Sequence, residues 1–179
     1  MPRPTPALAL LGFALLLSRA SPARAYEDQL TVGLDLGYAL SAGDRDSTHG
    51  ALLALQASVG LSAVWSARAR LGAALHPASP TMQLGLVGGE LLYLIDILEL
   101  VPVFGLGADA MLRRYPDTTA DPPEQRLDAA VHALLGLDYL LSRSLILGLA
   151  LRPHLRLTDL GGDPFYFMAS GAVSWVFDL

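Results

Sequence analysis

The chain has 179 residues, of which 53% are hydrophobic, with no cysteine and a formal net charge of −5. The lack of cysteine excludes a disulfide framework and any thiolate metal site. All 12 basic residues are arginines scattered among 17 acidic residues, which excludes the basic stripe that binds nucleic acid.

The N-terminus has the three regions of a secretory signal peptide. Arg3 supplies a positive charge, residues 7–17 form an uninterrupted apolar run, and small residues precede a cleavage site after Ala25. The run is shorter than the ~20 residues that a membrane-spanning helix needs. We therefore expect residues 1–25 to be a cleaved export signal and residues 26–179 to form one domain. Removing three arginines and no acid leaves nine arginines against 17 acidic residues, a formal net charge of −8.

Two long stretches without charge, 47–67 and 71–89, raise the alternative of membrane-spanning helices. In the first, apolar residues occupy every second position from Leu53 to Trp65, with small or polar residues between them. A helix in lipid needs apolar cover all round, whereas a strand needs it on one side only. The second stretch is interrupted by two prolines. The pattern therefore favours strands.

The domain contains eight runs of alternating apolar and small or polar residues. In the fourth run the apolar parity changes at Gly88 and Gly89, which predicts a β-bulge there. The eight predicted strands cover residues 30–40, a second run that ends at Trp65, 67–75, 82–95, 100–112, 127–141, 145–157 and 165–179.

Runs of about ten residues match the ~9–11 residues with which a tilted strand crosses the hydrocarbon. An even number lets the first and last strands pair and remove the sheet edges. Short turns at residue 66, at 96–98 and at 142–144 are expected on the periplasmic side with both termini. Four longer loops, of which residues 113–126 form the longest, are expected outside. The predicted fold is an all-β, eight-stranded antiparallel up-and-down transmembrane β-barrel.

Alternation alone leaves open a soluble barrel with an apolar interior. Its outer face would then be the one formed by Thr31, Gly33 and Asp35, which has too little charge for a small soluble domain. Small residues with a few paired charges suit the narrow lumen of an eight-stranded barrel. Aromatic residues near the turns and loops also predict two interfacial girdles. These aromatics are Tyr38, Trp65, Tyr93, Tyr139, Phe165, Phe167, Trp175 and Phe177.

The end of the chain is the most specific motif: Val173, Trp175, Phe177 and Leu179 alternate up to the terminus. It is similar to the C-terminal signal that the barrel-assembly machinery recognises, although that signal usually ends in Phe. The domain thus resembles the small eight-stranded outer-membrane barrels, such as the OmpA-type transmembrane domain. The resemblance implies a monomeric protein of the outer membrane, held in lipid after export and assembly. Members are often structural, sometimes adhesins or narrow pores, and occasionally lipid-modifying enzymes.

Inward-facing charges are the candidate site. The simplest interpretation is a network of ion pairs that fills the lumen, because buried charges are tolerated only when they are paired. A narrow passive pore for ions or small solutes is the alternative. The predicted lumen network consists of Asp35, Arg68, Arg70, Glu90, Glu99, Asp109, Asp128, His132, Asp138, Arg152, His154 and Arg156.

Nothing in the sequence predicts a catalytic, cofactor or metal site. A hydrolase or acyltransferase needs a hydroxyl, a histidine and a carboxylate that converge. His132, His154, Thr158 and Ser170 are the available groups, but no spacing singles them out. No pair of histidines at i, i+2 or i+4 indicates a metal site. The sequence therefore favours a structural or surface-exposed barrel without catalysis.

Overall fold

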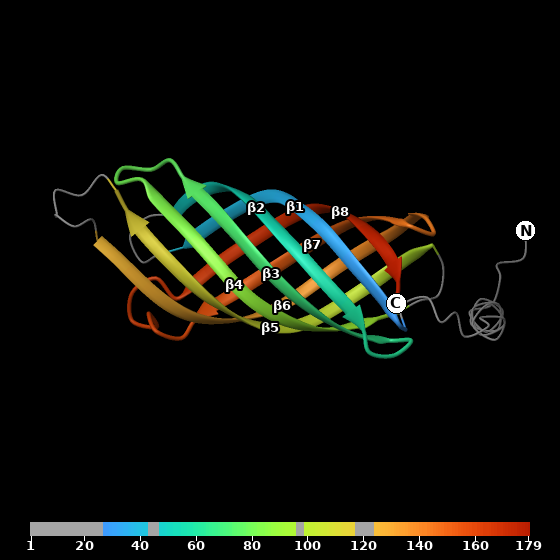
Figure 1. Ribbon diagram of the computed structural model, residues 1–179. Coiled ribbons are helices and arrows are strands. Elements are labelled where there is room, and N and C mark those ends of the chain that lie inside the picture. Colours follow the sequence, from blue (N-terminus) through green and yellow to red (C-terminus); the bar gives the residue numbers. More distant parts are fainter. Residues whose placement is uncertain (1–26, 43–46, 96–98, 117–123) are drawn as a thin grey trace, which may run out of the picture.

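The computed structural model describes residues 27–42, 47–95, 99–116 and 124–179, and these residues form one closed antiparallel β-barrel (Figure 1). Each strand pairs with its neighbours in sequence, and β1 pairs with β8, so the predicted all-β eight-stranded up-and-down barrel is confirmed. The strands are β1 (Gln29–Ala42), β2 (Ser47–Gly60), β3 (Trp65–His76), β4 (Met82–Leu94), β5 (Leu100–Tyr115), β6 (Glu124–Ser142), β7 (Leu145–Arg156) and β8 (Phe165–Asp178). No helix in the described residues is long and apolar enough to cross a membrane.

The two faces of each strand differ as the alternation predicts. On β1, Asp35 and Ala39 are buried in the lumen, whereas Leu34 and Leu36 are exposed on the outside. The pairing of β1 with β8 runs without interruption from Gln29, opposite Asp178, to Ala42, opposite Phe165. Closure leaves no sheet edge with unpaired backbone groups.

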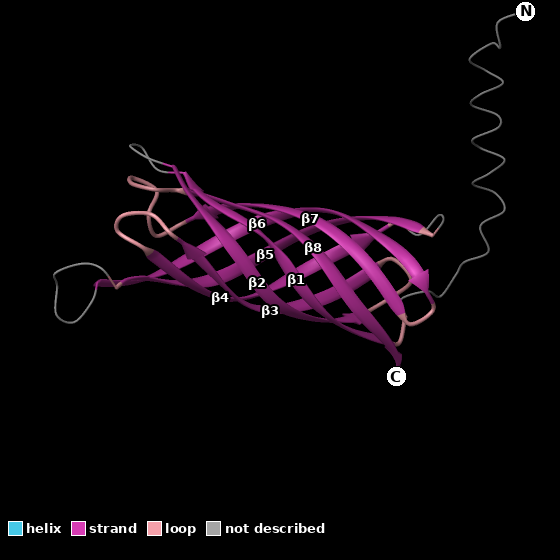
Figure 2. Cartoon of the chain, turned by 90° about the horizontal axis from the view of Figure 1, so that it is seen from above, coloured by secondary structure: helices cyan, strands magenta, loops and turns pink. Residues whose placement is uncertain are grey.

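The two ends of the barrel differ in the length of their connections. The start of β1 and the C-terminus lie at the end with the short connections, which are Leu61 to Val64 between β2 and β3 and Arg143–Ser144 between β6 and β7 (Figures 1 and 2). The loops joining β3 to β4 and β7 to β8 lie at the opposite end. The predicted turn at residues 96–98 and the predicted signal peptide at residues 1–25 lie outside the described residues.

The first turn differs from the prediction. Trp65 begins β3 and does not end β2, and the connection has four residues where one was predicted. The backbone N–H groups of Val64 and Trp65 both donate to Oγ of Ser62, which satisfies them inside the turn. Two apolar residues of this turn, Leu61 and Ala63, continue the alternation of β2, and the turn therefore could not be distinguished from the strand in the sequence pattern.

The predicted bulge in β4 is also wrong. The pairing of β4 with both neighbours is continuous through Gly88 and Gly89, and Met82, Leu84 and Leu86 point into the lumen together with Glu90. The prediction assigned these three apolar residues to the outside because it treated the lumen as uniformly polar. The described strands instead shift register between β6 and β7, at Leu140 and Ser142.

Strands β5 and β6 extend beyond their predicted ends. Arg113 and Arg126, which were assigned to the longest loop, lie directly opposite each other in the sheet. The central part of that loop, residues 117–123, lies outside the described residues. The longer strands bring the side chain of Arg113 into the lumen mouth, where it is buried.

The outer surface carries a continuous apolar belt around the middle of the barrel. Aromatic side chains are exposed toward the two ends of the belt, and Trp65 packs edge-on against Tyr93 with 5.1 Å between ring centroids. Phe167, also predicted in a girdle, is half-buried. The exposed apolar side chains of the middle include Leu34, Leu36, Leu53, Leu55, Leu71, Val87, Leu106, Leu135, Leu149 and Leu151.

Candidate functional site in the barrel lumen

The lumen is built in layers. A layer of buried charged side chains lies near mid-barrel, between two apolar clusters. The cluster toward the longer loops contains Ala39, Leu52, Ala74, Met82, Leu84, Leu86, Met111, Ala130, Tyr166 and Met168. The cluster toward the termini contains Leu92, Leu94, Val101, Val103, Leu134 and Ile146. The side chains of both clusters point into the lumen. They therefore cover the charged layer from both ends of the barrel.

Glu90 on β4 is the hub of the charged layer. Its Oε1 accepts a 2.7 Å hydrogen bond from Nε of Arg152, and Arg68 and Arg70 approach its two oxygens at 3.6 Å. The rest of the layer is paired in the same way, since Asp35 on β1 lies 3.7 Å from Arg70 and 3.6 Å from Arg152. The contacts of Arg152 with Glu90 and of Asp35 with Arg70 join strands that are not neighbours in the sheet, so they span the lumen.

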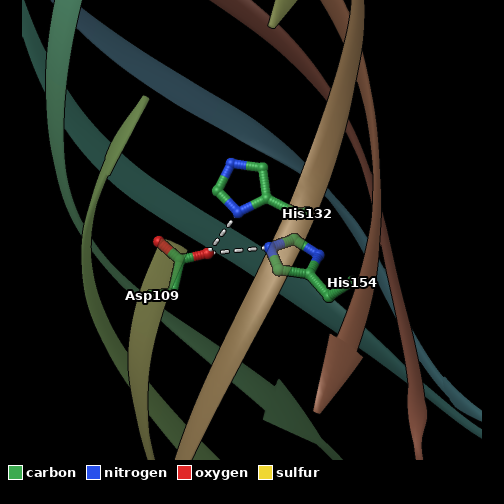
Figure 3. A group of neighbouring side chains, drawn as sticks. All are labelled: Asp109, His132 and His154. Carbon is green, nitrogen blue, oxygen red and sulfur yellow. Dashed lines mark hydrogen bonds and ion pairs between the residues drawn. The ribbon is translucent and has the colours of Figure 1, made fainter. Parts of the chain in front are cut away.

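Beside this hub lies a trio formed by Asp109, His132 and His154, one residue from each of β5, β6 and β7 (Figure 3). One oxygen of Asp109, Oδ2, lies 2.9 Å from Nδ1 of His132 and 2.9 Å from Nε2 of His154. The remaining nitrogen of each ring also has a partner: Nε2 of His132 lies 3.1 Å from Oε1 of Glu90, and Nδ1 of His154 lies 2.9 Å from the carbonyl oxygen of Arg152. All three side chains are fully buried.

A second polar group closes the end of the barrel that carries the longer loops. Nε of Arg113 donates to Asp128 at 2.5 Å, and its Nη2 donates to Asp159 in the β7–β8 loop at 2.8 Å. Thr158 donates to the other oxygen of Asp128 at 2.9 Å. The hydrogen bond from Arg113 holds the pKa of Asp159 below its usual value. Charged hydrogen bonds therefore hold the β7–β8 loop against the rim of the barrel. The rim group consists of Arg113, Asp128, Thr158 and Asp159.

The predicted lumen residues other than Glu99 lie on strands, with buried or half-buried side chains. Asp138 lines a cavity of about 20 Å³ together with Arg68, near the terminal end of the lumen. Arg156 is buried at the opposite end, where its Nη2 donates to Oγ of Ser41 at 3.1 Å. The residues brought together in the charged layer are Asp35, Arg68, Arg70, Glu90, Asp109, His132, Arg152 and His154, and Asp128 joins the rim group.

Glu99 is the exception. It has the parity of the inward residues of β5, but it lies before the first residue of that strand and is exposed. Alternation places a side chain in the lumen only within a strand, and β5 begins at Leu100. Glu99 therefore does not belong to the lumen network.

Two buried ionisable residues, Arg113 and His76, are absent from the predicted network. Arg113 shares the parity of Asp109 and Met111, and extending the predicted strand by a few residues would have revealed it. His76 was assigned to a loop, yet it is buried, with Nε2 3.0 Å from the hydroxyl of Tyr166 and Nδ1 3.2 Å from the carbonyl oxygen of Thr48. It shares the parity of Arg70 and Ala74, and extending the predicted third strand by one residue would have revealed it.

The hydroxyls considered for catalysis do not meet a histidine. Oγ of Ser170 accepts a hydrogen bond from Arg152 at 3.2 Å, and Thr158 lies in the rim group with Asp128. Within the described part of the chain, no hydrogen bond joins either hydroxyl to His132 or His154. The arrangement that nucleophilic acyl transfer requires is thus not assembled by these four residues.

Comparison with known proteins identifies the fold. No family model matches the sequence, and no curated protein matches it either. Among solved structures, Neisserial surface protein A superposes with a TM-score of 0.73 at 14% identity, covering 83% of this chain and 97% of that one. The N-terminal barrel domain of OprF from Pseudomonas aeruginosa gives a TM-score of 0.61 at 12% identity, with coverage of 84% and 98%. Ail, the attachment invasion locus protein of Yersinia pestis, gives 0.58 at 10% identity, with coverage of 84% and 99%. All three are small eight-stranded outer-membrane barrels, and this chain has their fold.

Proposed function

We propose that this chain is an integral outer-membrane protein whose plugged barrel has a structural or surface-exposed role and no catalytic activity. In this proposal residues 1–25 are the cleaved export signal and residues 26–179 form the single mature domain. The fold shared with outer-membrane barrels and the exposed apolar belt support the location, because a belt of this extent is not tolerated in water.

The observation that carries the plugged state is the layering of the lumen. Buried arginines and carboxylates pair across mid-barrel, and an apolar cluster covers each side of them. An ion that crosses this lumen must separate the pair of Arg152 and Glu90 and then pass apolar side chains without hydration. The layered lumen therefore favours a closed barrel over a passive pore.

Planar-bilayer recording tests the plug. Folded wild-type barrels are expected to stay silent, and openings are expected only after Arg152→Ala, which removes a guanidinium that contacts both Glu90 and Asp35. The exposed Arg126 supplies the matched control, because Arg126→Ala leaves the lumen unchanged and should stay silent. Discrete, reproducible openings of the wild type would overturn the plug and establish the narrow pore instead.

Assembly is the remaining part of the proposal. Val173, Trp175, Phe177 and Leu179 all lie on the outer face, exposed along the end of the chain. A recognition element for the barrel-assembly machinery has to present its side chains outward from the last strand, and this arrangement supports that role. The barrel closes on itself without a partner, which supports a monomer in outer-membrane lipid.

A further inference from the structure

We propose that Asp109, His132 and His154 form a binding site for one divalent first-row transition-metal ion inside the barrel. This inference goes beyond the structural role proposed above. It rests on the geometry of the trio, on the partners of the two imidazoles, and on the space left around the carboxylate.

The three ligand atoms surround a common point. Asp109 Oδ2 lies 2.9 Å from a nitrogen of each histidine, and the three ligand atoms all lie within 4.8 Å of one another. A point therefore lies within about 2.4 Å of all three atoms, half of the 4.8 Å limit. Transition-metal bonds to imidazole nitrogen and carboxylate oxygen measure about 2.0–2.2 Å. The site is thus within a few tenths of an ångström of coordination distance.

The hydrogen bond of His154 leaves its other nitrogen free for a metal. A carbonyl oxygen only accepts, so Nδ1 of His154 carries the hydrogen that it donates to the carbonyl of Arg152. In the neutral ring Nε2 then presents a lone pair, and it faces the carboxylate oxygen of Asp109. Two acceptors 2.9 Å apart repel each other, whereas a cation between them bonds to both.

His132 is arranged in the same way but with the opposite nitrogen. Its Nε2 lies 3.1 Å from Oε1 of Glu90, and in the tautomer that donates from Nε2 to Glu90 the lone pair of Nδ1 faces Asp109. Histidines that bind metals generally donate their second N–H to a carboxylate or to a backbone carbonyl, which fixes the tautomer and the ring orientation. This lumen supplies one of each: Glu90 behind His132 and the carbonyl of Arg152 behind His154.

Space around the trio is provided by glycine. A Cβ at Gly88 would overlap Oδ1 of Asp109, and a Cβ at Gly107 would lie 2.6 Å from the ring of His132. Oδ1 of Asp109 is buried and accepts no hydrogen bond, so it remains available as a further ligand atom. The two glycines thus make room for the carboxylate and the imidazole that meet at the proposed ion.

The donor set defines the class of ion. Two imidazoles and one carboxylate are ligands for Zn²⁺, Fe²⁺, Co²⁺ and related ions, whereas Mg²⁺ prefers oxygen ligands and retains its water. The trio spans three strands: His132 lies opposite His154, and Asp109 lies two residues along β5 from the partner of His132. A metal ion would therefore tie β5, β6 and β7 together from inside.

The test uses Co²⁺ as a probe because its visible absorption reports nitrogen and oxygen ligands. The tag-free chain is unfolded with chelator, refolded into detergent micelles with Co²⁺ or with Mg²⁺, and washed with chelator. Refolding loads the ion before the apolar clusters cover the site. The wild type is expected to retain about one Co²⁺ per chain, with a visible d–d spectrum and a raised melting temperature, and Mg²⁺ is expected to produce neither change.

Variants distinguish metal binding at the trio from adventitious metal binding elsewhere. Asp109→Asn and His154→Gln are each expected to lose the Co²⁺ spectrum and the metal-dependent shift, and Glu90→Gln is expected to weaken retention roughly 10- to 100-fold. His76→Gln is the matched control, since His76 is a buried lumen histidine outside the trio, and it should retain Co²⁺.

The outcomes are distinct from those of the plug experiment. A wild type that folds, as shown by its heat-dependent migration on a detergent gel, but retains no Co²⁺ would overturn the metal site and leave the barrel proposal intact. Equal loss of Co²⁺ in His76→Gln and His154→Gln would also overturn it. If one ligand variant does not fold, the wild-type spectrum and the other variant still decide.

Discussion

Nη2 of Arg113 on β5 donates a 2.8 Å hydrogen bond to Oδ2 of Asp159 in the β7–β8 loop. This contact joins the rim of the barrel to a loop that is far away in sequence. Because the donor is charged, the contact couples the position of the loop to the ionisation of one carboxylate.

The first prediction concerns pH. Arg113 holds the pKa of Asp159 below its usual value, so the contact stabilises the folded loop above pH ~3.9, the usual Asp pKa, and this contribution is lost as the pH falls through the lower folded pKa. An NMR titration of the Asp159 carboxyl carbon in micelles measures the pKa directly. Arg113→Gln should raise it, whereas Arg114→Gln, on the outward face of the same strand, should not. Equal pKa values in all three proteins would contradict the contact.

The second prediction compares a buried arginine with an exposed one. Arg152→Ala removes the 2.7 Å donor of Glu90 and one of the two arginines that pair with Asp35, and breaking a buried pair costs about 3–5 kcal/mol. Arg126→Ala removes the partner of Glu124, and with side chains 56% and 47% exposed this pair contributes only about 0–1 kcal/mol. Urea unfolding in micelles measures both free energies. Similar losses would mean that the lumen charges are hydrated rather than buried.

The third prediction uses two glycines of β4. In Gly88→Ala the new Cβ meets Asp109 Oδ1 and, at 2.5 Å, the carbonyl oxygen of Ala108, which cannot move without distorting β5. Such overpacking costs about 1–3 kcal/mol. Gly85→Ala places its Cβ where no atom lies within 4 Å, and it should leave the free energy of unfolding almost unchanged. The comparison fails if the two variants unfold alike.

The fourth prediction tests the lipid face. Leu149 in the middle of β7 is 64% exposed and Leu160 in the β7–β8 loop is 60% exposed, so their exposure is matched. Arginine at the bilayer midplane costs roughly 2–4 kcal/mol, whereas a loop in water tolerates it. Leu149→Arg should therefore destabilise barrels folded in liposomes, and Leu160→Arg should not. If both variants remain as stable as the wild type, the belt does not face lipid.

The fifth prediction concerns the terminal motif. Leu179→Phe should increase the fraction of chain that reaches the membrane as a heat-modifiable barrel, and Leu179→Asp should decrease it, because the proposed recognition element presents apolar side chains on the outer face. Asp178→Asn changes the adjacent residue, outside the outward-facing set, and serves as the control. An unchanged yield in every variant would remove the assembly role from this motif.

Alternation along the strands was sufficient to predict the strand number, the closure and the outward face, because lipid and lumen impose opposite demands at successive residues. It was insufficient where the lumen is apolar. Met82, Leu84 and Leu86 look like lipid-facing residues, and only pairing with β3 and β5 shows that they face inward.

The proximity of Asp109, His132 and His154 could not be predicted from the sequence, for a different reason. Asp109, His132 and His154 are each separated by more than 20 residues in sequence, and they meet only through the register of three strands. Parity predicted that each faces the lumen, but parity carries no information on height along the barrel axis. That height depends on strand register, which is set by pairing over the whole sheet.

The ion pairs that cross the lumen have a consequence for biogenesis. Glu90 on β4 and Asp35 on β1 both pair with the guanidinium of Arg152 on β7, so a sheet that lacks its last two strands loses a partner of both carboxylates. An unfinished sheet entering the bilayer would present those charges to hydrocarbon, at a cost that no local rearrangement removes. Only the complete barrel therefore pairs these inward charges fully. A chain truncated before β7 is expected to be degraded rather than to persist as a six-stranded intermediate, and pulse-chase labelling of such a chain would reveal its lifetime.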